Sequence, residues 1–271
     1  TQMNYLMAKA SKLYFVLFLI MFASFTAKDL KEEETIVVRE STVDLQIRVG
    51  EKIFVFGKAN GNLEKVKVGM NVLTFVQVPK IEGVSSTYQN FTWKRNSNGS
   101  IQIQSNYKPG PVTLTWTIFS NGQLKMEANG YIDQTQDLIG LSFDYQVSQL
   151  KEVSWLNSKN LSGSFFLENE ANDAAMDGKN ILELPEFHKV KLNFEYVGVE
   201  IKSENPSIEL NMGPVSKDDL MGWQSDISFL SIGKRELAKE NILSAPGKDS
   251  ENLKTNTDRK IGPMILWFDF H

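Results

Sequence analysis

The chain of 271 residues contains no cysteine and only two histidines. The absence of cysteine excludes disulfides, thiolate metal sites and a cysteine nucleophile, and it also excludes a lipid-modified cysteine as a membrane anchor. His188 and His271 are too few for a histidine-based metal cluster, and the carboxylates show no recognisable metal-ligand spacing. We therefore expect no cofactor and no metal.

A strong excess of charge of one sign is also absent. The formal net charge is −4, and no basic run is long enough to follow a phosphate backbone. Nucleic acid is therefore not expected as a partner. Hydrophobic residues make up 41% of the chain, so a protein of this length can bury a sizeable core.

Long hydrophobic runs are missing except near the N-terminus. Lys9 and Lys12 precede an apolar stretch at residues 13–22, and small or polar residues follow as far as Ala27. This order is typical of a secretory signal peptide, and the stretch is short for a spanning helix, which needs about 20 residues. We predict a signal peptide or N-terminal anchor at residues 1–27, a charged tether at residues 28–41, and export to the periplasm or the extracellular space. Contact with a membrane is expected only through this first segment, if it is not cleaved.

Apolar residues follow a period of two from Thr42 onward. Residues 43–49, 112–118 and 124–128 alternate apolar and polar side chains, as half-buried strands do. Further strands are predicted at residues 138–145, 150–156, 190–201, 208–212, 226–231 and 264–270. The only helix candidate is short, at residues 234–241, and a polar surface loop is expected at residues 245–260.

Three Asn-Gly pairs lie between predicted strands. Asn60-Gly61, Asn98-Gly99 and Asn121-Gly122 each tolerate the positive φ angles of a tight hairpin turn. They indicate a meander of antiparallel strands. We therefore predict an all-β protein in which residues 42–271 form one large antiparallel β-sandwich domain.

Two neighbouring motifs resemble a known family. Residues 140–145 read Gly-Leu-Ser-Phe-Asp-Tyr, and residues 153–156 read Val-Ser-Trp-Leu. Together they resemble the G-x-x-F-D-Y and V-x-W-L-G signature in the C-terminal β-sandwich of family-2 glycoside hydrolases, the β-galactosidase type. Weaker similarities keep the same order along the chain, at residues 61–66, 116–125, 185–187, 226–229 and 266–270. The resemblance implies a supersandwich of the kind shared with galactose mutarotases.

The resemblance departs from the family pattern in two places. After Trp155-Leu156 the chain continues from Asn157 to Gly163 without the Gly-Pro, the second aromatic residue and the arginine of the family. In addition, Gln146-Val147 replaces the usual Pro-Glu after Phe-Asp-Tyr. No alternating strand–helix pattern supplies the catalytic barrel, from which the family takes both of its carboxylates. We therefore expect no catalytic residue inherited from the family.

Four residues are candidates for carbohydrate binding. Trp155 and Trp223 could stack on a sugar ring, whereas Trp116 and Trp267 lie inside alternating strands and are expected to pack in the core. His188 lies beside Glu186, an arrangement that could serve a mutarotase as acid and base; the alternative is that His188 only solvates the start of a strand.

The leading hypothesis is an exported, non-catalytic domain that binds carbohydrate or completes the active site of a separate or upstream catalytic barrel. The alternatives are a small sugar-processing enzyme of aldose-epimerase type, a fragment of a full glycoside hydrolase, and a relative that keeps the sandwich only as a scaffold.

Overall fold

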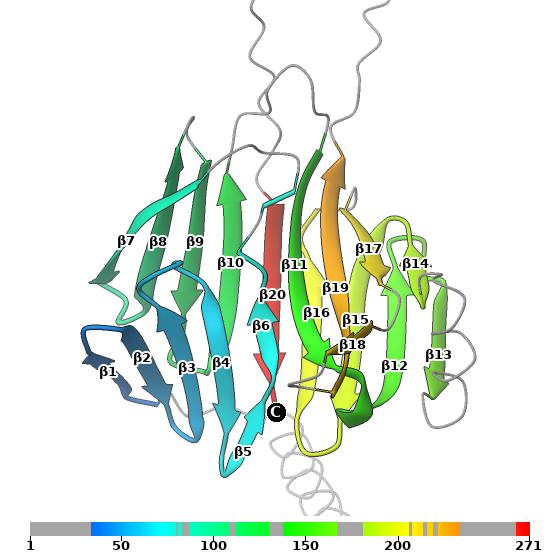
Figure 1. The fold of residues 1–271 in the computed structure, drawn as a ribbon, viewed down its shortest axis with the longest axis horizontal. Helices are drawn as coiled ribbons and strands as arrows, with labels where there is room; N and C mark the ends of the chain where they lie inside the picture. Colours follow the sequence, from blue (N-terminus) through cyan, green and yellow to red (C-terminus); the bar gives the residue numbers. More distant parts are fainter. Residues whose placement is uncertain are drawn as a thin grey trace, which may run out of the picture. The chain divides into compact units, whose positions relative to one another are not determined.

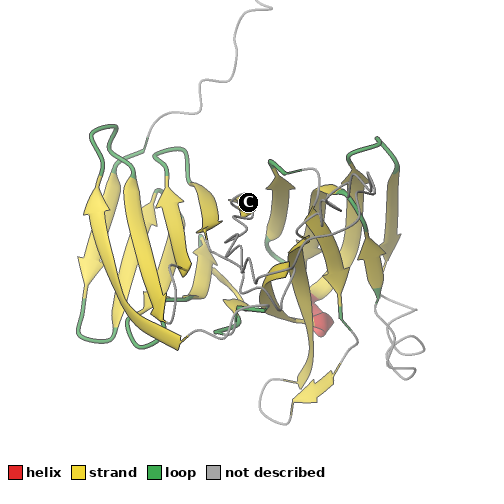
Figure 2. Cartoon of the chain, turned by 90° about the horizontal axis from the view of Figure 1, so that it is seen from above, coloured by secondary structure: helices red, strands yellow, loops and turns green. Residues whose placement is uncertain are grey.

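The computed structural model describes residues 34–79, 81–82, 87–108, 112–129, 138–166, 181–205, 208–213, 216–218, 222–232 and 264–271. Nearly all elements in these ranges are strands, apart from one short 3-10 turn, η1 (Val147–Gln149) (Figure 2). All of the strand pairs are antiparallel. The prediction of an all-β antiparallel fold is confirmed. The predicted signal segment, the helix at 234–241 and the loop at 245–260 lie outside the described residues.

The largest sheet has nine strands and forms one layer of the fold (Figure 1). Its middle is occupied by the C-terminal strand, which pairs with strands from the first and the second half of the chain. In spatial order the strands are β13 (Ser162–Phe166), β12 (Leu150–Asn157), β15 (Phe187–Phe194), β16 (Gly198–Ser203), β20 (Met264–Phe270), β10 (Gln123–Asn129), β9 (Val112–Ile118), β8 (Ile101–Lys108) and β7 (Thr87–Arg95).

A five-stranded sheet is built by the first part of the described chain. It is a simple meander, in which each strand pairs with the next along the sequence. The strands are β1 (Ile36–Glu40), β2 (Asp44–Val49), β3 (Lys52–Gly57), β4 (Leu63–Val68) and β5 (Asn71–Leu73).

The third sheet has six strands, of which five form one path and a short one lies beside it. Its order is β14 (Leu182–Leu184), β17 (Ile208–Met212), β19 (Gly222–Ile232), β11 (Leu138–Gln146) and β6 (Phe75–Gln77), with β18 (Ser216–Asp218) paired to β19. The strands β11 and β19 are in register over nine residue pairs and form the longest ladder of this sheet.

The five-stranded and six-stranded sheets pack against different halves of the nine-stranded sheet (Figure 1). On one half, Phe56 of β3 meets Trp116 of β9, with ring centroids 5.9 Å apart. On the other half, Phe187 of β15 meets Phe229 of β19 at 5.4 Å. The predicted sandwich is therefore confirmed, with one continuous sheet facing two smaller ones.

Phe143 of β11 lies in an aromatic cluster that joins the six-stranded sheet to the nine-stranded sheet. This ring stacks on Phe75 at 4.9 Å and contacts Trp116 at 6.3 Å, Phe268 at 5.4 Å and Phe229 at 6.2 Å. All five side chains are completely buried. Aromatic pairs in such edge and offset arrangements contribute about 0.5–1.5 kcal/mol each beyond the area that they bury.

The buried indole of Trp116 also needs a polar partner. Its N–H donates to the side-chain oxygen of Gln77, 3.3 Å away, and Gln77 is itself 1% exposed. An indole N–H without an acceptor at this depth would cost free energy. The single polar side chain of Gln77 therefore allows the largest residue of the core to be buried.

The Asn-Gly turns lie where they were predicted. Gly99 connects β7 to β8 and Gly122 connects β9 to β10, with φ angles of 82° and 76°. In both turns the preceding asparagine side chain accepts a hydrogen bond from a backbone N–H two residues later, which fixes the turn.

Three predictions about local structure need correction. Residues 36–40, which were assigned to the tether, form β1 and pair with β2. The predicted strand at 190–201 is two strands, β15 and β16. Their apolar period slips between Phe194 and Val197, where the backbone turns and Phe194 N–H donates to the carbonyl of Val197. Trp267 is not in the core: it lies partly exposed on the outer face of β20, where its ring stacks on Phe119 at 5.3 Å.

The central position of Phe143 can be tested by truncation. We expect Phe143→Ala to lower the free energy of unfolding by about 3–5 kcal/mol, because the cavity would remove ring contacts within the six-stranded sheet and to the nine-stranded sheet. Tyr196, whose side chain is 70% exposed, serves as a control, and Tyr196→Ala should change stability by less than about 0.5 kcal/mol. Urea denaturation measures both values, and similar effects of the two substitutions would contradict the assigned core.

Candidate functional site

The four residues predicted for carbohydrate binding are spread over two sheets. Trp155 lies in β12 and His188 is exposed near the start of β15. Trp223 begins β19 rather than lying in a loop, because β19 starts at Gly222. Of these four residues, Trp155 lines the larger of the two cavities described below.

Glu186 has a structural task in the turn before β15. Its φ angle is 54°, in the left-handed region, and its backbone carbonyl accepts a hydrogen bond from Ser158 N–H at 2.8 Å. Its carboxylate lies 2.9 Å from the ammonium of Lys159. Both contacts bind the turn that precedes β15 to the turn that follows β12. The carboxylate is therefore directed to Lys159.

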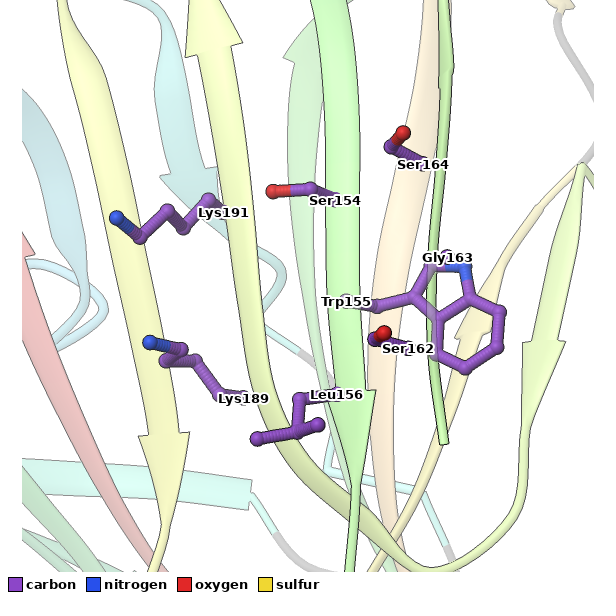
Figure 3. A pocket seen from close by; sticks show the side chains of 8 residues that line it. All are labelled: Ser154, Trp155, Leu156, Ser162, Gly163, Ser164, Lys189 and Lys191. Atoms are coloured by element: carbon purple, nitrogen blue, oxygen red, sulfur yellow. The ribbon is translucent and has the colours of Figure 1, made fainter. Parts of the chain in front are cut away.

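A cavity of about 440 Å³ opens on the outer face of the nine-stranded sheet, over β13, β12 and β15 (Figure 3). We call it the serine–lysine cavity. Cross-strand partners point to the same face of a sheet, so the ladders place its side chains in two rows. One row is Ser164, Ser154 and Lys191, and the other is Ser162, Leu156 and Lys189.

Trp155 contributes to this cavity with its backbone rather than with its ring. Its indole points away from Lys189 and Lys191 and lies against Gly163 of the neighbouring strand (Figure 3). A Cβ atom on Gly163 would come within 2.5 Å of the ring, so only glycine leaves space for the indole there. The tryptophan of the V-x-W-L motif therefore fastens edge strand β13 to β12, and it offers the cavity no stacking surface.

A cluster of three lysines around one carboxylate lies next to the cavity, on the side towards the middle of the sheet. The oxygens of Glu200 in β16 lie 2.6 Å from the ammonium of Lys202, 3.1 Å from that of Lys191 and 3.8 Å from that of Lys189. Burial raises the pKa of the Glu200 carboxyl, but hydrogen bonds from Lys202 and Lys191 outweigh it, so that the pKa lies below its usual value. The three ammonium groups therefore favour the ionised form of Glu200, which lies beneath them.

A second, smaller cavity of about 250 Å³ lies on the outer face of the six-stranded sheet. We call it the aspartate cavity. Asp144 of β11 and Asp226 of β19 are direct cross-strand partners in it. Asp144 is the central residue of the Phe-Asp-Tyr motif, whose Phe143 and Tyr145 point into the core. The remaining lining residues are Val78, Glu82, Ser142, Gln224 and Ser225.

The two aspartates have different surroundings. Ser228 donates to Asp226 at 2.8 Å, and because its only proton is used there, Ser142 donates to Ser228 at 2.8 Å. For Asp144, burial raises the pKa of the carboxyl, and the negative charge of Asp226 raises it further. A carboxyl with a raised pKa beside a second carboxylate is an arrangement that acid–base catalysis uses.

Neither a scan of protein-family models nor a search of curated proteins gives a match to this chain. The resemblance to the family-2 glycoside hydrolases therefore stays a prediction. In the described part of the chain, no group of three or more side chains could hold a metal ion. No helix within the same residues is long and apolar enough to cross a membrane.

Sequence reasoning missed most of the residues that line the two cavities. The alternation of β15 and β16 placed Lys189, Lys191 and Glu200 on a polar face, but only the strand register brings them together. Asp144 carried a usable signal, because it is a carboxylate between two core aromatics of the motif. Its partner Asp226 lies 82 positions further along the chain and gave no such signal.

The aspartate pair makes stability depend on pH. The pKa of Asp144 in the folded protein lies above its ordinary value of 3.8. The folded state therefore binds more protons than the unfolded state just above pH 3.8, and the free energy of unfolding falls as pH rises through the raised pKa. We expect Asp144→Asn to raise stability at pH 7 by about 0.5 kcal/mol, because like charges on cross-strand partners are destabilising. Near pH 3 the gain should vanish.

Urea denaturation between pH 3 and pH 7 measures this effect. The matched control is Asp269→Asn, which removes the ion pair of Asp269 with Lys52 at 3.0 Å and should lower stability at pH 7. If Asp144→Asn were less stable than the unchanged protein at pH 7, Asp144 would be a stabilising anion and the assigned repulsion would be wrong.

Proposed function

We propose that residues 34–271 form a non-catalytic domain that binds carbohydrate in the serine–lysine cavity. The observation that carries the proposal is an open cavity of about 440 Å³ whose rim combines three hydroxyl groups with two ammonium groups. This volume lies within the range typical of small-molecule sites. Hydroxyl groups donate and accept hydrogen bonds and ammonium groups donate them, which matches the many hydroxyls of a saccharide.

The rigidity of the cavity supports the same role. Its lining residues lie in β12, β13 and β15, and β12 pairs with each of the other two over most of its length. Groups that are held by sheet ladders lose little freedom when a ligand binds, so that less affinity is spent on ordering them.

The family resemblance supports the proposal independently. The Val-Ser-Trp-Leu motif supplies Ser154, Trp155 and Leu156 of the cavity. In a relative of the β-galactosidase type, such a domain would present sugar to a separate or upstream catalytic barrel, or complete its active site. The predicted signal segment at residues 1–27 would place this activity outside the cytoplasm, where extracellular glycans are accessible.

Binding can be tested on an oligosaccharide array followed by titration calorimetry. We expect at least one class of saccharide to bind, and Ser154→Ala combined with Lys191→Gln to weaken this binding about tenfold or more, since a hydroxyl group and a charged donor are lost. Lys94→Gln, on edge strand β7 of the same sheet, is the control and should bind normally. Absence of any bound saccharide, or equal binding by the double variant, would refute the proposal.

A second function has one observation in its favour. The facing carboxyls of Asp144 and Asp226, one with a raised pKa, could serve as acid and base for a sugar-processing enzyme of aldose-epimerase type. This pair is a better candidate than Glu186 and His188, because Glu186 is directed to Lys159.

Polarimetry distinguishes this second function from binding alone. If the aspartate cavity is catalytic, the folded protein should speed the mutarotation of galactose or glucose, and Asp144→Asn should reduce the added rate at least about a hundredfold, the low end of a typical acid–base contribution. An unchanged rate in the presence of the folded protein would eliminate the enzymatic alternative and leave the binding proposal intact.

A further inference from the structure

We propose that the serine–lysine cavity selects acidic saccharides, in which carboxylate or sulfate groups accompany the hydroxyls. This inference rests on the proposed carbohydrate binding and names the class of ligand. The inference is based on the positive charges at the cavity, which would find no opposite charge on a neutral sugar.

The lysines at the cavity exceed their counter-charges. Lys189 and Lys191 line it, and Lys202 is the cross-strand partner of Lys189 on the next strand. Glu200 is the cross-strand partner of Lys191 and contacts all three ammonium groups. Three positive charges against one negative charge leave an excess of two. The whole chain, in contrast, carries a net charge of −4.

Glu200 holds the lysines together without saturating them. Its side chain is only 16% exposed, whereas the lysine side chains are 33–49% exposed, so the carboxylate lies below and the ammonium groups reach outward. Each ammonium has three donors, and the closest approach of Lys189 to Glu200 is 3.8 Å, beyond hydrogen-bond distance. Donors are therefore available for an anion at the rim.

The other carboxylates nearby have partners of their own. Glu152 accepts a hydrogen bond from Asn193 at 2.9 Å, and Glu186 pairs with Lys159. Asp269, the cross-strand partner of Glu200 on the far side, lies 3.0 Å from the ammonium of Lys52. Each of these anions is held by a group other than the lysines of the cavity.

The lining residues also lack a means of holding a neutral sugar tightly. The ring of Trp155, the only aromatic residue among them, points away from the lysines, so no flat surface is offered to a pyranose. Recognition must then come from hydrogen bonds. Bonds between an ammonium and an anionic oxygen are roughly twice as strong as neutral ones, and they favour a ligand that carries carboxylate or sulfate.

Three oligosaccharides of equal length test the selectivity: an oligogalacturonate, a sulfated chondroitin fragment and a neutral oligogalactose. We expect calorimetry on the full chain at low salt to show at least one acidic ligand binding about tenfold or more tightly than the neutral one, with a preference that declines at high salt. Comparison of the two acidic ligands identifies carboxylate or sulfate as the preferred group.

Paired lysine variants locate the effect. Lys189→Gln with Lys191→Gln should reduce the affinity for the acidic ligand about tenfold, with binding of the neutral ligand changed less than about twofold. Lys94→Gln with Lys108→Gln removes the same charge at the opposite edge of the sheet and should have no such effect. Circular dichroism and thermal unfolding confirm that each variant folds.

The outcomes separate this inference from the proposed function. Equal affinity for acidic and neutral oligosaccharides would overturn the selectivity but leave carbohydrate binding standing. Equal losses in both double variants would also overturn it, because the attraction would then come from the overall charge rather than from the cavity. If none of the saccharides binds, both proposals fail.

Discussion

The packing of Phe143 against Trp116, within the aromatic cluster that joins the three sheets, is the constraint on which the fold depends. A nine-stranded sheet is too broad for either of the smaller sheets to cover, so the second layer must be assembled from two. Phe143 of the six-stranded sheet contacts Trp116 and Phe268 of the nine-stranded sheet. Trp116 in turn contacts Phe56 of the five-stranded sheet, so that one aromatic cluster joins all three sheets. Because the rings are fully buried and in contact, a change in the position of one sheet would disturb the other two.

The same constraint gives the residues of the Phe-Asp-Tyr motif different roles: the two aromatic residues pack in the core, and the aspartate lies on the outer face. Side chains alternate along a strand, so the burial of Phe143 and Tyr145 obliges Asp144 to point outward. The register of β11 with β19 then places Asp226 beside it. The motif marks a fold because its aromatic residues are fixed by the core. Its aspartate is available for a function because its side chain does not pack in the core.

Features that depend on a few neighbouring residues could be predicted from the sequence, whereas features that depend on the pairing of distant strands could not. The period of two located most strands, and the Asn-Gly pairs at 98–99 and 121–122 located two hairpins, because both signals are contained in a few neighbouring residues. The position of β20 between β16 and β10 was not predictable in this way, since it joins segments more than sixty residues apart. The role of Trp155 was not predictable either, because its ring direction depends on Gly163 of an adjacent strand.

The candidate sites lie on outer faces for a related reason. In the part of the chain that the structure describes, the inner faces carry mostly buried aromatic and aliphatic side chains, whereas both cavities open on outer faces. An outer face has no concave core to desolvate a ligand, so its affinity must come from groups that remain strong in contact with water. Charged donors grouped around Glu200 satisfy this requirement better than the single aromatic residue of the cavity, whose ring is turned away. The sheet register that brings Lys191 opposite Glu200 is therefore what turns an ordinary polar strand surface into a candidate binding site.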